Sequence, residues 1–329
     1  MSEIKNRSEI LFLYDIQNAN PNGDPNDENK PRIDEETGRN LVTDVRLKRT
    51  IRDYIQDKGN DIFVREVIYD KEGHIQDAKL RAADYLPVDK EMLKTMPAEE
   101  QKQFIAKSIL EKCIDIRLFG ATIPLDLKVA DGNKTKSVTS SITWTGPVQF
   151  KMGRSLHSVK IQHIKGTGAF ASKAGATQKT FREEYFLPYS LIGFYGVVNE
   201  NAAGHTELQQ TDVELLKQAV WNGTKGLISR SKFGQMPRLL LIVNYKQPDF
   251  FIGDLDNLIE LKPKDAMRPE QLRKPEDYQI DISMLMEQIK EHADKIEDIE
   301  FSVDERLTFV KDEKAVKLND LDKFKKISL

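Results

Sequence analysis

The order of the apolar segments restricts the fold of this chain more than any other feature of its sequence. The run from Ile10 to Ile16 predicts a buried strand, and apolar spacing after Thr43 predicts a helix at about 44–56 that this threonine caps. Further segments predict strands at 140–152 and 186–198, a helix from a capping box of Thr211 and Glu214 to Trp221, and a central strand at 238–245. With insertions removed, the order strand, helix, strand, strand, helix, strand predicts an α+β, ferredoxin-like fold.

Three segments lie outside this pattern. Residues 60–140 contain many polar residues and a helix predicted at Ala98–Lys112, and we interpret them as an insertion. Residues 153–183 are rich in Gly, Ser, Thr and Lys and predict a flexible, basic segment that projects from the fold. After Lys246 the chain is highly charged, which predicts a mostly helical tail with a helix at 282–296 and a short strand near 300–310.

Charge and cysteine content exclude several classes of protein. Charged residues make up 31% of the chain but the net charge is −3, so any surface for nucleic acid would have to be local. The single cysteine, Cys113, allows neither a disulfide framework nor a cysteine zinc site, and we predict no cofactor and no metal. The run from Leu239 to Val243 is too short to span a bilayer, and Met1 to Glu9 is no signal peptide. We therefore expect a cytoplasmic protein without a membrane partner.

The helix predicted at 44–56 carries the most informative charges. Its cations are Arg46, Lys48, Arg49 and Arg52, and they are offset by Asp44 and Asp53. A row of cations on a rigid helix suits the phosphates of a single nucleic-acid strand. A solvated charged face explains the same run equally well, so both interpretations stay open at this point.

Two loops and one basic segment offer further contacts. The loop from Asn18 to Pro25 has oxygen side chains at alternate positions, as a calcium-binding loop does. A strand precedes it in place of a helix, and Asn29 stands where a calcium loop has glutamate, so we interpret the segment as an ordinary turn. The loop from Ser229 to Gly234 alternates hydroxyls with cations and could bind phosphate. The projecting segment includes Lys165 and Lys173, which could lie across an RNA strand, although an ordinary surface loop has the same composition.

Taken together, these segments resemble the backbone subunit of type I CRISPR surveillance complexes (Cascade), family seven of the CRISPR-associated proteins, and most closely its subtype I-B branch. The resemblance covers about residues 8 to 246. The stretches that carry it are Asn18–Pro25, Pro31–Gly38, Leu41–Arg52, Asp115–Thr122, Gly146–Phe150, Gly153–Leu156 and Ser229–Lys232.

The resemblance implies an RRM-like palm with a finger insertion and a thumb hairpin. By position the parts are the first part of the palm at 1–59, the finger at 60–140, a palm strand at 141–152, the thumb at 153–183, the second part of the palm at 184–246 and a C-terminal extension at 247–329. It also implies a non-catalytic subunit that stacks in several copies along the guide RNA, beside other Cascade subunits, and presents the guide to target DNA. The implied RNA contacts are Asn20, Asn22, Arg46, Lys48, Arg49, Arg52, Arg154, Ser155, Lys165, Lys173, Ser229, Arg230 and Lys232.

Two other functions stay open on sequence alone. A ferredoxin-like RNA-processing endonuclease needs a general base near a ribose hydroxyl, and His163 is the residue we would name. A related branch cuts target RNA with a loop aspartate, for which Asp24 and Asp27 are candidates. A plain oligomerising protein without an RNA role is the remaining alternative.

Overall fold

The computed structural model shows a mixed α/β fold and describes residues 3–86, 96–131, 134–171 and 179–329. Two compact units divide it. The first comprises Met1–Arg7, Ile51–Gln149 and Val197–Ala219, and the second comprises Ser8–Thr50, Phe150–Gly196 and Val220–Leu329. Among the residues that the structure describes, no helix has the length and apolarity needed to cross a membrane.

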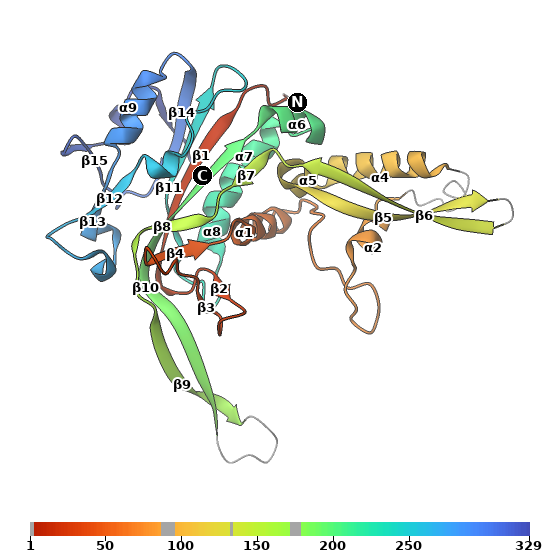
Figure 1. Cartoon of the computed structure of the whole chain (residues 1–329), viewed down its shortest axis with the longest axis horizontal. Helices are drawn as coiled ribbons and strands as arrows, with labels where there is room; N and C mark the ends of the chain where they lie inside the picture. The colour runs from red at the N-terminus through yellow and green to blue at the C-terminus, as the bar shows by residue number, and fades with distance from the viewer. Residues whose placement is uncertain (1–2, 87–95, 132–133, 172–178) are drawn as a thin grey trace. The chain divides into compact units, whose positions relative to one another are not determined.

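A large sheet forms the frame of the second unit (Figure 1). Its strand order is β17-β14-β11-β1-β10-β8-β4, and β7 and β9 also pair with β10. The bounds are β1 Ser8–Ala19, β4 Arg39–Val42, β7 Val148–Phe150, β8 Gly153–Ser158, β9 Gln162–Ala171, β10 Lys179–Val198, β11 Met236–Tyr245, β14 Ile296–Val303 and β17 Phe324–Lys326. Strands β1 and β11 are continuous apolar runs because both of their faces are covered, and they pair antiparallel from Ser8 opposite Asn244.

Short elements complete the second unit. The strands β2 (Gly23–Asp24) and β3 (Lys30–Pro31) pair with each other in the loop after β1. Beyond β11 a smaller sheet has the order β12-β13-β15-β16, with bounds Glu260–Pro263, Tyr278–Asp281, Phe309–Lys311 and Lys314–Val316. The helices here are α8 (Thr224–Gly226), α9 (Ser283–Glu291) and 3-10 turns at Leu255–Asn257, Pro269–Gln271, Pro275–Asp277 and Leu318–Asp320.

Helix α1 (Asp44–Asp57) confirms the first predicted helix. The hydroxyl of Thr43 accepts a hydrogen bond from the Arg46 N–H at 3.3 Å, so this threonine caps the helix as predicted. Leu47, Ile51 and Ile55 are buried at helical spacing and fix which face of α1 packs inward.

The first unit holds the helices and the long hairpin of the predicted insertion. The bounds are α2 Ala78–Ala83, α4 Ala98–Lys112, α5 Ile114–Phe119, β5 Gly120–Asp131, β6 Lys134–Thr145, α6 Glu200–Thr206 and α7 Gln210–Gln218. Helix α4 has the predicted bounds. Its Ile105 and Ile109 pack with Ile123 and Leu125 of β5 in one apolar core. The segment 140–152, predicted as one strand, is divided between β6, which pairs with β5, and β7.

Two predictions about helices are wrong. Helix α7 begins two residues earlier than predicted, because its capping box is formed by Gln209 and Asp212 and not by Thr211 and Glu214. A π-helix at Ala219–Gly223 then follows α7. The tail after residue 246 is mainly β structure, since strands β12 to β17 lie there beside the single α-helix α9 in this fully described stretch.

Strands β9 and β10 form a two-stranded hairpin that extends beyond the sheet of the second unit (Figure 1). The predicted projecting segment at 153–183 is therefore only partly projecting, because β8 at its start pairs with β10 and β4 inside the sheet. The described part of the hairpin runs from Gln162 to Ala171 and from Lys179 onward.

Candidate nucleic-acid interface

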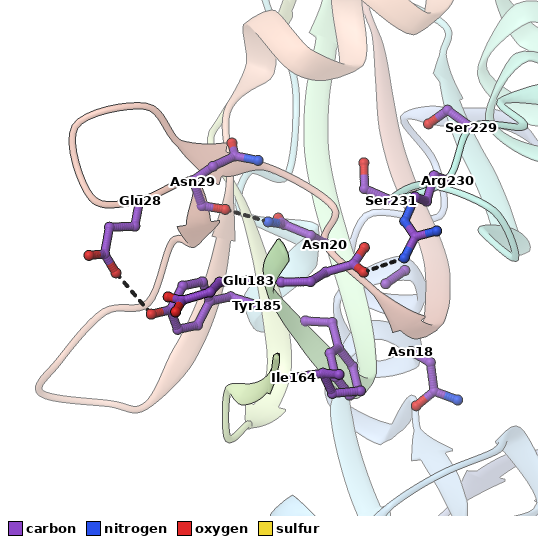
Figure 2. A pocket seen from close by; sticks show the side chains of 13 residues that line it. Asn18, Asn20, Glu28, Asn29, Ile164, Glu183, Tyr185, Ser229, Arg230 and Ser231 are labelled. Carbon is purple, nitrogen blue, oxygen red and sulfur yellow. Dashed lines mark hydrogen bonds and ion pairs between the residues drawn. The ribbon is translucent and has the colours of Figure 1, made fainter. Parts of the chain in front are cut away.

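Three segments of the second unit meet around a groove of about 810 Å³ (Figure 2). They are the loop after β1, the base of the β9–β10 hairpin, and residues 225–233, which we call the basic loop. The lining residues are Asn18, Ala19, Asn20, Glu28, Asn29, Ile164, Glu183, Glu184, Tyr185, Phe186, Ser229, Arg230 and Ser231. Predicted contacts from two distant parts of the sequence, Asn20 and the pair Ser229 and Arg230, are thus brought together.

Asn20 joins two walls of this groove. Its N–H donates to the Ser231 carbonyl at 2.9 Å, and its side-chain amide donates to the Asn29 carbonyl at 2.7 Å. The Lys232 ammonium donates to the Asn20 carbonyl at 2.5 Å. Because Asn20 is only 4% exposed, it organises the loops around the groove and presents little surface of its own to a ligand.

Asn22 has a similar organising role. Its side-chain oxygen accepts hydrogen bonds from the N–H and the hydroxyl of Thr43, both at 2.9 Å. Since Thr43 caps α1, this amide fixes the loop after β1 to the start of the helix that carries the cations. The side-chain oxygen of Asn22 is therefore used to hold the loop against the start of α1.

Arg46 and Lys232 are two like charges that lie close together in the second unit. Burial and, as a smaller cause, the nearby charge of Arg46 lower the pKa of Lys232 to about 8. The Arg46 guanidinium donates to the Thr50 hydroxyl at 3.0 Å, which holds it in place along α1. Two like charges in a half-buried location repel each other, so an anion placed between them would be strongly favoured.

The other cations of α1 do not form one row facing solvent. Lys48 pairs with Asp44 at 3.1 Å, whereas the Arg49 side chain is exposed. Arg52 has a different environment. Its side chain is 12% exposed and bonds the fully buried Asp115 at 3.0 Å, so its charge compensates a buried carboxylate in the first unit.

Two predicted contacts on β8 differ in exposure. Ser155 is buried, and its hydroxyl donates to the His157 carbonyl at 2.6 Å and accepts from the Asn40 N–H at 2.8 Å. Its hydroxyl therefore already has partners inside the protein. Arg154 is exposed, and both residues line a separate cavity of about 500 Å³ that shares no lining residue with the groove.

Carboxylates at the base of the hairpin already bind several groups around the groove. Glu184 pairs with Arg230 at 2.9 Å, and Glu183 pairs with Lys165 at 2.8 Å. The Tyr185 hydroxyl donates to Glu28 at 2.9 Å, as Figure 2 shows. These links hold the hairpin base against both loops. Lys173 lies outside the described residues.

The aromatic ring of Tyr185 is a part of the site that the sequence analysis missed. It stacks on His163 with a centroid separation of 4.6 Å, and the Lys30 ammonium lies 5.1 Å from its centroid. A cation–π contact of this kind orients the loop after β1 against the hairpin. The sequence signal was weak, because Tyr185 is one aromatic residue in a long strand.

The residues named for RNA cleavage have other partners. His163 stacks on Tyr185 and lies 3.7 Å from Glu183. Asp24 pairs with Arg32 at 2.8 Å, and Asp27 pairs with Lys30 at 2.7 Å. Among the described residues, the one group of three ligands close enough for a metal ion is Asp70, Glu72 and His74, on an exposed turn of the first unit.

Comparison with known proteins connects this geometry to a family. The family model described as CRISPR-associated protein Cas7 matches residues 6–283. A CRISPR-associated protein Cas7 of Haloferax volcanii is 35% identical over 313 residues, which covers 92% of this chain and 88% of the relative.

One solved structure supports a shared fold, and a second is reported beside it. A chain described as CRISPR RNA-guided surveillance complex, pre-nicking, has a TM-score of 0.54 at 14% identity, covering 98% of this chain and 97% of that one. A second chain, described as CRISPR RNA-guided surveillance complex, has a TM-score of 0.49 at 14% identity and covers 91% and 90%.

Proposed function

Because this chain belongs to the CRISPR-associated protein Cas7 family, we propose that it is a non-catalytic subunit that holds guide RNA by its backbone. The single observation that supports this most is the half-buried pair of like charges, Arg46 and Lys232, of which Lys232 donates to the carbonyl of Asn20, a lining residue of the groove. A phosphate bound there relieves their repulsion and raises the pKa of Lys232 again. The exposed Arg49 and Arg230 extend the positive surface for neighbouring phosphates.

The proposed contacts neutralise phosphates and do not read bases. Phosphate contacts position an RNA strand but carry no sequence information, so any spacer sequence is accepted. Arg46, Arg49, Arg230 and Lys232 are the residues that we propose to touch the backbone, with Lys48, Lys165 and Ser229 as further contacts. Asn20 and Asn22 keep the surrounding loops in place. Arg154 lies beside a different cavity and would meet another part of the guide.

The sheet supports the proposed palm. Strands β11, β1, β10 and β8 lie side by side in this order, with antiparallel pairing of β11 to β1 and of β10 to β8. In the proposed ferredoxin-like palm these four strands form the sheet, and β8 takes the place of the second strand. We assign residues 60–140 to a finger insertion and the β9–β10 hairpin to a thumb.

We place the subunit in a type I-B Cascade complex in the cytoplasm. In this assignment several copies stack along the spacer part of the crRNA, beside other Cascade subunits. The exposed bases of the guide then pair with target DNA. A backbone grip of this kind orders the guide in advance, which reduces the conformational entropy that pairing would otherwise cost.

RNA binding by an Arg46→Gln, Lys232→Gln variant tests the proposal. We expect weaker binding to single-stranded RNAs of several unrelated sequences, with the same loss for each. Each lost phosphate contact should reduce the slope of log affinity against log salt by about 0.7. A Lys314→Gln, Lys317→Gln variant is the matched control, because both lysines are exposed in the tail. An unchanged slope in the first variant would contradict the site.

A further inference from the structure

An unusually exposed aromatic ring lies at the end of the basic loop. Phe233 is 65% exposed, which is more than any other Phe, Tyr or Trp among the residues that the structure describes. Within that part of the chain, no other aromatic ring and no cation stacks on it. Single exposed apolar residues are common on protein surfaces, so exposure alone does not make a site. The ring does, however, have a face available for another planar group.

The backbone of the loop holds this ring in a fixed place. The Ser229 carbonyl accepts the N–H of Lys232 at 3.1 Å and the N–H of Phe233 at 2.8 Å, which closes a tight turn. Gly234 follows with a φ of +88°, a conformation that residues with a Cβ rarely adopt. The chain then enters β11. Phe233 is therefore presented by a turn that is closed on one side and continues into the sheet on the other.

The charge beside the ring points to nucleic acid. Lys232 directly precedes Phe233, and its ammonium donates to the carbonyl of Asn20, a lining residue of the groove. That acceptor is neutral, so the positive charge of Lys232 stays in place, whereas Arg230 is paired with Glu184. Consecutive Cα atoms are about 3.8 Å apart, so a phosphate bound by Lys232 brings a base of the same strand near the ring.

A nucleotide fits this pair of side chains better than a protein surface does. A protein partner that covered the ring would also remove water from Lys232, and it would need an acidic group at that point to offset the cost. Every nucleotide of a single strand carries both an anion and a planar ring. Proteins that bind single strands combine cations along the backbone with aromatic rings under the bases. Lys232 and Phe233 give this combination in two successive residues.

We propose that the ring of Phe233 stacks on one base of the guide, beside the phosphate at Lys232. The inference rests on the proposed function and deepens it, because it adds a base contact to a grip on the backbone. Stacking uses the flat face of a base, and every base has such a face, so the contact tolerates any sequence. The hydrogen-bonding edge of the stacked base stays free for pairing with DNA.

An RNA without bases separates a base contact from a backbone contact. Fluorescence anisotropy at constant salt measures binding to oligoadenylate and to an abasic RNA of the same length, which keeps every ribose and phosphate. Phe233→Ala should bind oligoadenylate about fivefold or more weakly than the wild type, and it should bind the abasic RNA equally well. Phe233→Tyr keeps a ring and should bind both RNAs as the wild type does.

The matched control is Phe251→Ala, because Phe251 is 44% exposed and lies outside the basic loop. It should bind both RNAs as the wild type does. Binding of the abasic RNA by Phe233→Ala also shows that this variant is folded, since that RNA needs the same phosphate contacts.

The outcomes separate the stacking contact from the proposed function. A loss on oligoadenylate alone, restored by tyrosine, supports stacking. Undiminished binding of oligoadenylate by Phe233→Ala overturns it. Equal losses on both RNAs also overturn it, because Phe233 would then act on the backbone contacts or on the loop itself. These two results leave RNA binding by the wild type intact, whereas a wild type that binds neither RNA refutes the proposed function and the stacking contact together.

Discussion

Replacing Glu184 by Gln should strengthen RNA binding, because this carboxylate already pairs with a guanidinium that we propose for a phosphate. The Arg230 side chain is 64% exposed and lies 2.9 Å from Glu184. RNA phosphate and Glu184 therefore compete for the positive charge of Arg230. Replacing the carboxylate by an uncharged amide weakens that competition.

The size of the effect follows from the exposure of the pair. Exposed ion pairs contribute about 0.2–1 kcal/mol, which corresponds to a gain in affinity of about 1.4-fold to 5-fold. Loss of one negative charge near RNA also strengthens binding through long-range attraction, and that contribution does not depend on Arg230. A double-mutant cycle separates the two contributions.

Fluorescence anisotropy with a labelled single-stranded RNA at low salt measures the cycle. The four proteins are the wild type, Glu184→Gln, Arg230→Gln and the double variant, with Glu313→Gln as a control for net charge because Glu313 is exposed in the tail. We expect Glu184→Gln to gain more affinity when Arg230 is present than when it is absent. Equal gains in both backgrounds would refute competition for the guanidinium, and an undiminished affinity of Arg230→Gln would remove Arg230 from the interface.

Three further predictions concern single residues. The pKa of Lys232 is lowered to about 8 in the free protein, and a bound phosphate favours the charged form, so RNA binding takes up a proton at higher pH. The affinity for RNA should therefore fall by up to about tenfold per pH unit above about pH 8. Titrations at constant salt measure this, and a Lys232→Arg variant should lack the dependence. Asn22→Ala removes two hydrogen bonds to Thr43 and should destabilise the protein by about 1 kcal/mol in urea unfolding; a loss that adds fully to that of Thr43→Ala would contradict their coupling. Arg52→Ala leaves Asp115 buried without its cation and should destabilise the protein by roughly 3 kcal/mol, while the salt slope of RNA binding stays as in the wild type.

Helix caps and helical apolar spacing in the sequence were enough to predict the helices that they mark. Helix α4 has the predicted bounds, and Thr43 caps α1, because caps and helical apolar spacing lie within a few residues of each other. The long β5–β6 hairpin was missed although Ile123, Leu125 and Leu127 alternate along β5. Its pairing partner is visible only in three dimensions. The tail was predicted as mostly helical because it is highly charged, and the strand predicted near 300–310 overlaps only the end of β14.

The candidate site was predicted in its parts but not in its arrangement. Cations at 46, 48, 49 and 52 look equivalent in the sequence, yet Arg52 points to Asp115, which is 63 residues away. Ser155 looks like a surface hydroxyl until its neighbours Asn40 and His157 enclose it. Tyr185 and Glu28 are 157 residues apart, so no local pattern could show their hydrogen bond. Contacts between residues far apart in the sequence decide which polar side chains are left exposed to bind a ligand. The types of the residues alone do not show these contacts.

Strand β14 has a consequence for anyone who shortens this protein. It pairs with β11 from Leu239 opposite Val303 to Tyr245 opposite Ile296, although it lies beyond the last residue matched by the family model. Without it, the almost wholly apolar β11 would become an outer strand with open N–H and C=O groups, a template on which other chains can add. A truncation before residue 296 is therefore expected to precipitate, and safe trimming starts only after β17.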